Sequence, residues 1–210
     1  MKEQLMPVET RFGRSVQPSG ADTLAALIPE LVVALEAGGA PVKGFFEPGV
    51  SRNIVERALA PLGLTAPDEL VTWFSWQNGQ TPTRQPSVLP FSIPQSIEWV
   101  AGNYAYYQRN EILPEGRWAW SPGWLCLDGD AHGLNMWCGD DPKQPPRIRR
   151  PDEENRPLDA HNNVGQIVSL CTVVAWWIEA IESGALYWTN HWNSTYLKLP
   201  EAGRRSLILP

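Results

Sequence analysis

The residues best suited to chemistry are acidic and aromatic side chains clustered downstream of position 124. Asp128 and Asp130 lie in the segment DGDAHG, and Asp140 and Asp141 follow a short apolar stretch. Carboxylates at alternate positions of a glycine-containing turn are typical of calcium loops. His132 replaces a third oxygen ligand, and no Glu stands where the loop should end. The sequence therefore favours a hairpin turn over a metal site.

Nucleophiles and metal ligands do not form a recognisable set. The histidines His132, His161 and His191 lack zinc-ligand spacing, and no nucleophile elbow, phosphate loop or dinucleotide fingerprint occurs. Cys171 could pair with His161, but it falls in an apolar helical pattern, which favours a packing role. We predict no catalytic residues, no metal and no cofactor, so the protein is not expected to be an enzyme.

The three cysteines contain no Cys-x-x-Cys pair. Cys126 and Cys138 could face each other across a hairpin, but thiols of cytosolic proteins are normally reduced. The cysteines are therefore interpreted as small buried hydrophobic residues.

Charge and hydropathy limit the class of partner. The chain has 210 residues and a net charge of -6, which disfavours non-specific nucleic-acid binding and is compatible with a basic protein partner. The longest apolar run, Leu170 to Ile178, is too short to cross a bilayer, and Met1 to Thr10 lacks the apolar core of a signal peptide. We expect a cytoplasmic protein with no membrane partner.

Tryptophan is unusually abundant, with 11 residues in the chain. Most lie on apolar stripes and are expected to pack in or near the core. Trp176 lies off the stripe of its helix, so either the C-terminal tail covers it or it belongs to a binding surface. Trp188 and Trp192 lie beside polar residues and could stack on a sugar or anchor a protein contact, but packing against the body is favoured.

Hydrophobic periodicity predicts helices in the first half of the chain. One begins at Asp22, carries Pro29 and ends at Gly38-Gly39; another begins at Ser51 or Asn53. The segment from Leu64 to Gly79 should form a helix, with Thr65 able to cap its start and Asn78-Gly79 providing a left-handed end. Its inner stripe comprises Leu70, Trp73, Phe74 and Gln77. A further helix should have Pro94 in its first turn and an inner stripe that includes Ile97, Val100, Ala101 and Tyr104.

The period then changes. Residues 124–127 and 134–138 should form a hairpin, and residues 147–149 a third strand that Pro145 and Pro146 make unlikely to be central. Residues 151–163 are interpreted as a loop. Residues 169–184 should form the last helix, which Ser169 caps and Gly184 ends. The tail from residue 187 onwards is of uncertain form. This order predicts an α+β fold with helices packed on a small, mainly antiparallel sheet.

The segment LTAPDELVTWFSWQNG at residues 64–79, together with SPGWLCLDGD at residues 121–130, resembles the SUKH superfamily. These are bacterial immunity proteins related to yeast cell-wall assembly regulators. Further matching pieces are Asp140-Asp141-Pro142 and the helix at residues 169–184. The resemblance implies a single SUKH-like domain over residues 51–184, with an extension over residues 1–50 and a tail over residues 185–210 that packs on the domain.

The resemblance also implies a function in protein binding. A bacterial member would neutralise a cognate toxin, often a nuclease, by covering its active site. We expect the contact surface to comprise Asp128, Asp130, Asp140 and Asp141 with the nearby Trp124 and Trp137. The alternatives are a scaffolding module of the cell-wall regulator type and a carbohydrate-binding protein that uses tryptophan.

Overall fold

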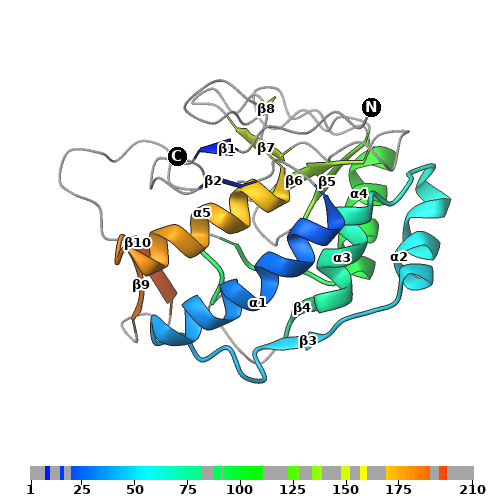
Figure 1. Cartoon of the computed structure of the whole chain (residues 1–210). Helices are drawn as coiled ribbons and strands as arrows, with labels where there is room; N and C mark the ends of the chain where they lie inside the picture. Colours follow the sequence, from blue (N-terminus) through cyan, green and yellow to red (C-terminus); the bar gives the residue numbers. More distant parts are fainter. Residues whose placement is uncertain are drawn as a thin grey trace.

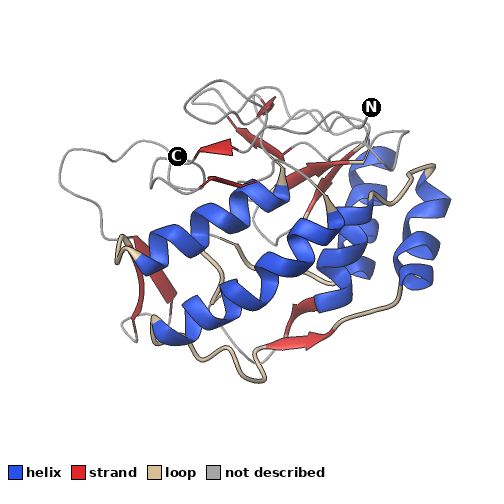
Figure 2. Cartoon of the chain, in the orientation of Figure 1, coloured by secondary structure: helices blue, strands red, loops and turns tan. Residues whose placement is uncertain are grey.

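The structure is a computed structural model. It describes side chains over residues 20–81, 88–90, 92–109, 123–127, 134–138 and 169–188, and backbone alone at 8–9, 15–16, 110, 148–151, 157–159, 189 and 194–197. The fold is α+β, as predicted, and every strand pairing in the described residues is antiparallel (Figures 1 and 2).

Helix α1, Ala21–Ala37, is the long predicted helix with an apolar stripe. Its buried residues recur at helical spacing: Leu24, Leu27, Ile28, Leu31, Ala34 and Leu35. Pro29 lies within one continuous helix, and its side chain points to solvent. Gly38 ends the helix as predicted. The buried stripe packs against α5 (Leu170–Glu182) and α3 (Asp68–Trp76) (Figure 1).

Helix α5 is buried on all sides. The Ser169 side chain accepts a hydrogen bond from the backbone N–H of Thr172, which caps the first turn as predicted, and Gly184 follows the helix with a φ of 72°. Every residue from Leu170 to Ile181 is buried. Trp176, which lies off the main stripe, is covered and does not form an exposed surface.

Helix α3 is shorter than predicted. Its predicted inner stripe is correct, because Leu70, Trp73 and Phe74 are buried in the core. Pro67, and not Thr65, occupies the cap position. The helix ends at Trp76 because the chain then becomes extended and pairs with another strand.

That strand is β4, Gln77–Gln80, which pairs with β3, Phe46–Pro48. Gly79 has the predicted left-handed φ of 95°, but it lies inside β4 and does not end the helix. A Cβ at Gly79 would lie 2.7 Å from the backbone nitrogen of Ser96, so the close approach of the two segments also requires glycine.

Helix α4, Ile97–Asn110, begins three residues after Pro94, so the prediction that Pro94 lies in its first turn is wrong. Two side chains cap this helix: the Asn78 Oδ1 accepts from the N–H of Ile97, and the Ser96 Oγ accepts from the N–H of Trp99. Helix α2, Arg52–Leu59, starts after Ser51, as expected, and continues into a short 3₁₀ turn, Ala60–Leu62.

The largest sheet has the strand order β5-β6-β7-β8, formed by Trp124–Cys126, Asn135–Trp137, Ile148–Pro151 and Pro157–Asp159. The predicted hairpin and third strand are confirmed. The expectation of a non-central third strand is wrong, because β7 pairs on both sides. Residues 151–163, which were interpreted as a loop, contain β8. This short strand pairs with the backbone N–H and C=O groups on the second edge of β7.

Two small hairpins complete the described elements. β1 (Val8–Glu9) pairs with β2 (Ser15–Val16), and β9 (Leu186–Thr189) pairs with β10 (Ser194–Leu197). β2 contacts α5, and β9 follows the end of that helix. Part of the tail of uncertain form therefore consists of a hairpin.

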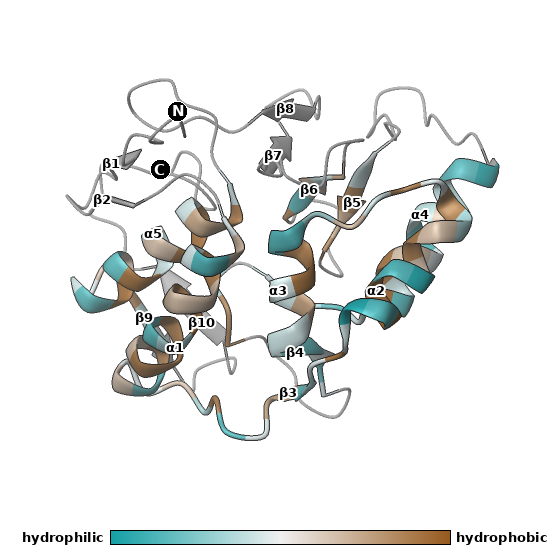
Figure 3. Ribbon diagram, turned by 45° about the vertical axis from the view of Figure 1, so that its right-hand side comes forward, coloured by the Kyte–Doolittle hydropathy of each residue, from teal (hydrophilic) through white to brown (hydrophobic). Residues whose placement is uncertain are grey.

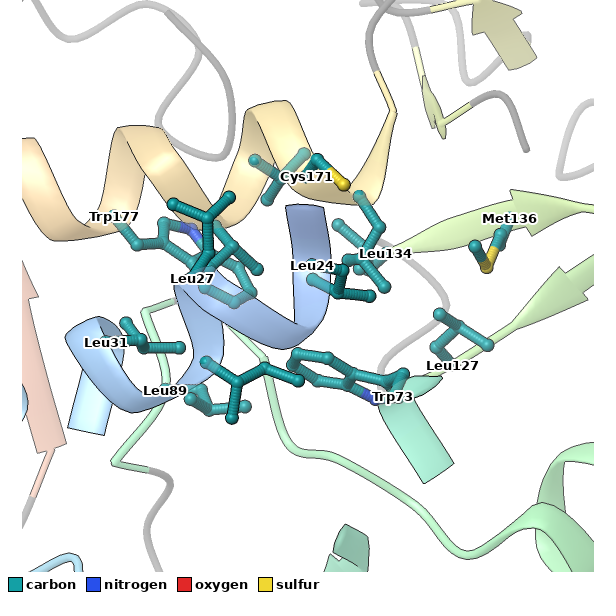
Figure 4. Close-up of a cluster of buried hydrophobic side chains, with 14 of the residues drawn as sticks. Leu24, Leu27, Leu31, Trp73, Leu89, Leu127, Leu134, Met136, Cys171 and Trp177 are labelled. Atoms are coloured by element: carbon teal, nitrogen blue, oxygen red, sulfur yellow. The ribbon is translucent and has the colours of Figure 1, made fainter. Parts of the chain in front are cut away.

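One hydrophobic core connects the helices with the largest sheet. Figure 4 shows side chains that converge from both sheet and helices: Leu24, Leu27, Leu31, Trp73, Leu89, Leu127, Leu134, Met136, Cys171 and Trp177. Helix α1, from the predicted N-terminal extension, contributes to the same core as α3 and α5. No helix in the described parts of the chain is long and apolar enough to cross a membrane.

Candidate functional site

The β5–β6 hairpin has two chemically different faces. Leu125 and Met136 are completely buried and point into the core, whereas Trp124 and Trp137 are half-buried on the opposite face. This alternation follows from the period of two in extended chains. The two predicted tryptophans of the contact surface therefore lie on one side of the sheet.

The register of the hairpin places the two tryptophans directly opposite each other. Hydrogen bonds join Cys138 to Gly123 and Leu127 to Leu134, at the two ends of the paired region. Since hydrogen-bonded and non-hydrogen-bonded pairs alternate, the tryptophans occupy a non-hydrogen-bonded pair, in which cross-strand side chains come closest. The result is a compact aromatic surface on a short hairpin.

Gly123 makes this arrangement possible. Its φ is 85°, and a Cβ at this position would lie 2.9 Å from the indole nitrogen of Trp137. The Trp137 ring therefore rests against the glycine backbone. The Pro-Gly-Trp motif found in the sequence needs its glycine for both the turn and this contact.

The hairpin is held by α4 and by the residues before it. The N–H of Gly123 donates to the buried hydroxyl group of Tyr104 over 3.0 Å, and the N–H of Gln95 donates to the carbonyl of Leu127 over 3.2 Å. The two anchors lie at opposite ends of the hairpin. The aromatic surface is consequently fixed before any partner binds.

The four acidic residues of the predicted surface, Asp128, Asp130, Asp140 and Asp141, lie outside the described residues. In sequence, Asp128 directly follows Leu127 at one end of the paired region, and Asp140 comes two residues after Cys138 at the other end. The two acidic segments therefore adjoin opposite ends of the hairpin in sequence.

Cys126 and Cys138 do not face each other across the hairpin. Asn135 is the cross-strand partner of Cys126, and Cys138 is buried on the opposite face. Alternate residues of a strand point to the same face of the sheet, so Cys138 shares the buried face of Met136, whereas Cys126 lies on the opposite face. Neither cysteine forms a disulfide.

A second aromatic surface was not predicted from the sequence. Trp99 is 40% exposed and Tyr106 is 50% exposed, and both lie on the outer face of α4. The inner face, with Val100 and Tyr104, was correctly predicted to be buried. The spacing of seven residues between Trp99 and Tyr106 places them on one face and was the available signal.

Among the described carboxyl groups, Glu69 has the most strongly raised pKa, and its side chain is only 2% exposed. Its Oε1 accepts a hydrogen bond from the N–H of Gly20 over 2.7 Å, and the Sγ of Cys171 lies 3.3 Å from the same oxygen. Its Oε2 makes no hydrogen bond. Burial raises the pKa of Glu69 from 4.5 to about 7, although the nearby N–H groups of Gly20, Leu170 and Cys171 favour the charged form.

This buried pair is not a nucleophilic site. Burial raises the pKa of the Cys171 thiol, and the adjacent charge of Glu69 raises it further. The thiol is fully buried and remains protonated, whereas reactive cysteines are accessible and have lowered pKa values. His161, the other half of the dyad considered from the sequence, lies outside the described residues.

Other described regions offer little for substrate chemistry. An open hollow of about 560 Å³ lies over α2, with Glu56 and Arg57 in its lining. No group of three or more His, Cys, Asp or Glu within the described residues could hold a metal ion. Trp188 is half-buried against the core, and Trp192 lies outside the described residues.

Comparison of the chain with protein-family models and with curated proteins finds no match. The geometry of the hairpin and its half-buried tryptophans is therefore the main structural guide to function.

Proposed function

We propose that this protein is a cytoplasmic immunity protein that binds a cognate toxin and covers its active site without catalysing a reaction. The observation that carries the proposal is the half-buried Trp124–Trp137 pair on a hairpin fixed from both ends. Tryptophan is enriched among the residues that dominate the binding energy of protein interfaces. A surface that is already ordered loses little conformational entropy on binding.

The charge of the chain supports a basic partner. The net charge is -6, and Asp128, Asp130, Asp140 and Asp141 adjoin the hairpin in sequence. Nucleases bind a polyanion through basic side chains, so an acidic surface could occupy the same cleft. Opposite charges would accelerate the encounter, and the aromatic pair would slow dissociation.

The resemblance of residues 64–79 and 121–130 to the SUKH superfamily supports the same class of function. In the structure these residues form α3, β4 and the start of the hairpin. A scaffolding module of the cell-wall regulator type is the alternative within this resemblance. The two differ in whether the protein protects a cell from a toxin.

The test is to look for a toxin domain encoded beside this gene and to co-express the two proteins, scored by cell survival and by binding of the purified proteins. Wild-type protein should protect, and Trp124→Ala or Trp137→Ala should weaken binding by about 100-fold, as expected for central interface residues. Tyr187→Ala is the matched control, because Tyr187 is an exposed aromatic residue on β9.

Thermal melting of each variant separates loss of binding from loss of folding. Full protection and unchanged affinity in both folded tryptophan variants would refute the proposed surface. A wild-type chain that neither binds nor neutralises the toxin would refute the immunity function and favour scaffolding.

A further inference from the structure

The outer face of α4 is a second aromatic surface, distinct from the β5–β6 hairpin. Trp99, Gly102 and Tyr106 follow one another at spacings of three and four residues, so they form one stripe along the helix. All three are exposed, while Tyr104 on the opposite face bonds to the hairpin. Figure 3 shows α4 at the periphery of the molecule, next to α2.

Gly102 lies between the two aromatic residues and leaves the backbone of the helix open. A Cβ at this position would meet no atom of the described residues within 4 Å, so none of their contacts requires glycine there. Glycine inside a helix also lowers helix stability relative to alanine. A small residue on an exposed helix face allows another helix to approach closely. Such an approach would explain the presence of glycine at position 102.

The charges that border the stripe are arranged in a self-complementary way. Glu98 and Arg109 are both exposed, lie on the same flank of the stripe and occupy opposite ends of α4. In an antiparallel pair of identical helices related by a two-fold axis, the two ends of one flank face each other. Glu98 of each copy would then face Arg109 of the other.

We infer that the outer face of α4 binds a second copy of this chain, through antiparallel α4 helices that cross at Gly102. Trp99 of one copy packs against Tyr106 of the other, and two Glu98–Arg109 ion pairs border the contact. A face that carries one carboxylate and one guanidinium fits its own two-fold image better than a uniformly basic partner. This inference does not depend on the proposed immunity function.

The dimer should be weak. A single pair of helices buries less surface than the roughly 800 Å² per partner of standard stable interfaces. We therefore expect a dissociation constant in the range of tens to hundreds of micromolar, on the order of what small interfaces provide. Sedimentation equilibrium of the full chain should show a monomer–dimer equilibrium in this range.

Gly102→Gln is the first test. A Cβ at position 102 meets no described atom within 4 Å, the position is exposed, and helix propensity rises, so folding should be retained. The side chain should block the helix crossing and weaken dimerisation by about tenfold or more, because close packing at the crossing point is lost. A dimer that survives Gly102→Gln with unchanged affinity would overturn the inference.

A charge exchange provides the second test. Glu98→Arg alone and Arg109→Glu alone place like charges opposite each other, so each variant should be monomeric. An equimolar mixture of the two variants restores both ion pairs and should form a heterodimer. Glu36→Arg, at an exposed position of α1, is the control for the change in net charge and should not alter dimerisation.

The outcomes show whether this face binds a second copy of the chain or a different partner. Wild-type protein that stays monomeric at about 0.5 mM overturns the inference, because a dissociation constant of up to hundreds of micromolar would give a substantial fraction of dimer at that concentration. So does a mixture of the two charge variants that remains monomeric. If a basic toxin domain protects Trp99 from fluorescence quenching, while no dimer forms, the face belongs to a different partner.

Discussion

At the scale of single residues, Glu69 is the most consequential polar group in the described structure. Its carboxyl group lies where α1 and α5 begin, and only one of its oxygens is hydrogen-bonded. A buried carboxylate is costly unless it is fully paired. This explains why burial raises the pKa of Glu69 to about 7, even though backbone N–H groups surround it.

The raised pKa of Glu69 makes stability depend on pH. The folded state holds the proton more tightly than the unfolded chain, so this contribution to stability is complete below pH 4.5 and is lost as the pH rises through about 7. The expected loss is about 3 kcal/mol, from 1.36 kcal/mol for each unit of pKa shift.

Glu69→Gln should remove this dependence. Between pH 4.5 and pH 8, the free energy of unfolding of the variant, measured in urea, should rise by about 3 kcal/mol relative to that of wild type. Glu36→Gln, at an exposed position on α1, should follow wild type. Parallel curves for wild type and Glu69→Gln would show that the carboxyl group titrates normally.

The sequence predicted the roles of single residues correctly where a residue type has one usual structural role, such as glycine at a positive φ or serine at a helix N-cap. The left-handed conformation of Gly79 and the cap at Ser169 were both predicted. The role of Asn78 was not, because its side chain caps a helix that begins nineteen residues later in sequence. Such a contact depends on the tertiary fold and leaves no local signal.

At the scale of elements, the helices with strong apolar periodicity were predicted well. α1, α2 and α5 occur close to their expected ranges. α3 ended early because pairing of β4 with β3 took precedence over the helical pattern. β7 became an interior strand despite the prolines before it, since both lie upstream of its paired residues.

The junction between β4 and α4 gives a testable element-level prediction. Asn78 accepts from the N–H of Ile97 over 2.8 Å and donates to the Glu98 carboxylate over 3.2 Å. Asn78→Ala removes both bonds and leaves the first turn of α4 without this cap. The free energy of unfolding should fall by about 1–2 kcal/mol, the usual cost of losing an N-cap.

Asn53→Ala is the matched control, because Asn53 lies exposed in the first turn of α2. Its effect should stay within about 0.5 kcal/mol, as for most surface substitutions. Urea unfolding measures both variants. Equal effects of the two substitutions would contradict the proposed role of Asn78.

At the scale of the whole molecule, the hydrophobic core crosses the domain limits predicted from the sequence. The limits at residues 50 and 184 remain a prediction, but α1 packs most extensively on α5 and α3. Sequence patterns give the apolar face of α1 and not its partner. Pairing between elements at opposite ends of a chain is therefore the least predictable part of the fold.

Leu31→Ala tests whether α1 is part of the common core. Leu31 is fully buried, so the substitution should lower the free energy of unfolding by about 3 kcal/mol and leave a single transition. Val33→Ala on the same helix is the control, because Val33 is 66% exposed and should change stability by less than about 0.5 kcal/mol. A separate early transition for Leu31→Ala would indicate an independent N-terminal unit.

The candidate site shows the same division between local and long-range information. The hairpin that carries Trp124 and Trp137 was predicted, because short apolar runs flanked by turn residues are a local signal. The support from Tyr104 and Gln95 depends on tertiary contacts, and the spacing of Trp99 and Tyr106 was present in the sequence but not interpreted.

The packing of α1 on α5 has a consequence for synthesis on the ribosome. Gly20 and Cys171, which meet where the two helices begin, are 151 residues apart in sequence. The apolar face of α1 leaves the exit tunnel long before its partner helix has been translated. Contacts of such long range also slow folding, and exposed apolar surface promotes aggregation. The nascent chain should therefore need chaperone protection until α5 has been translated.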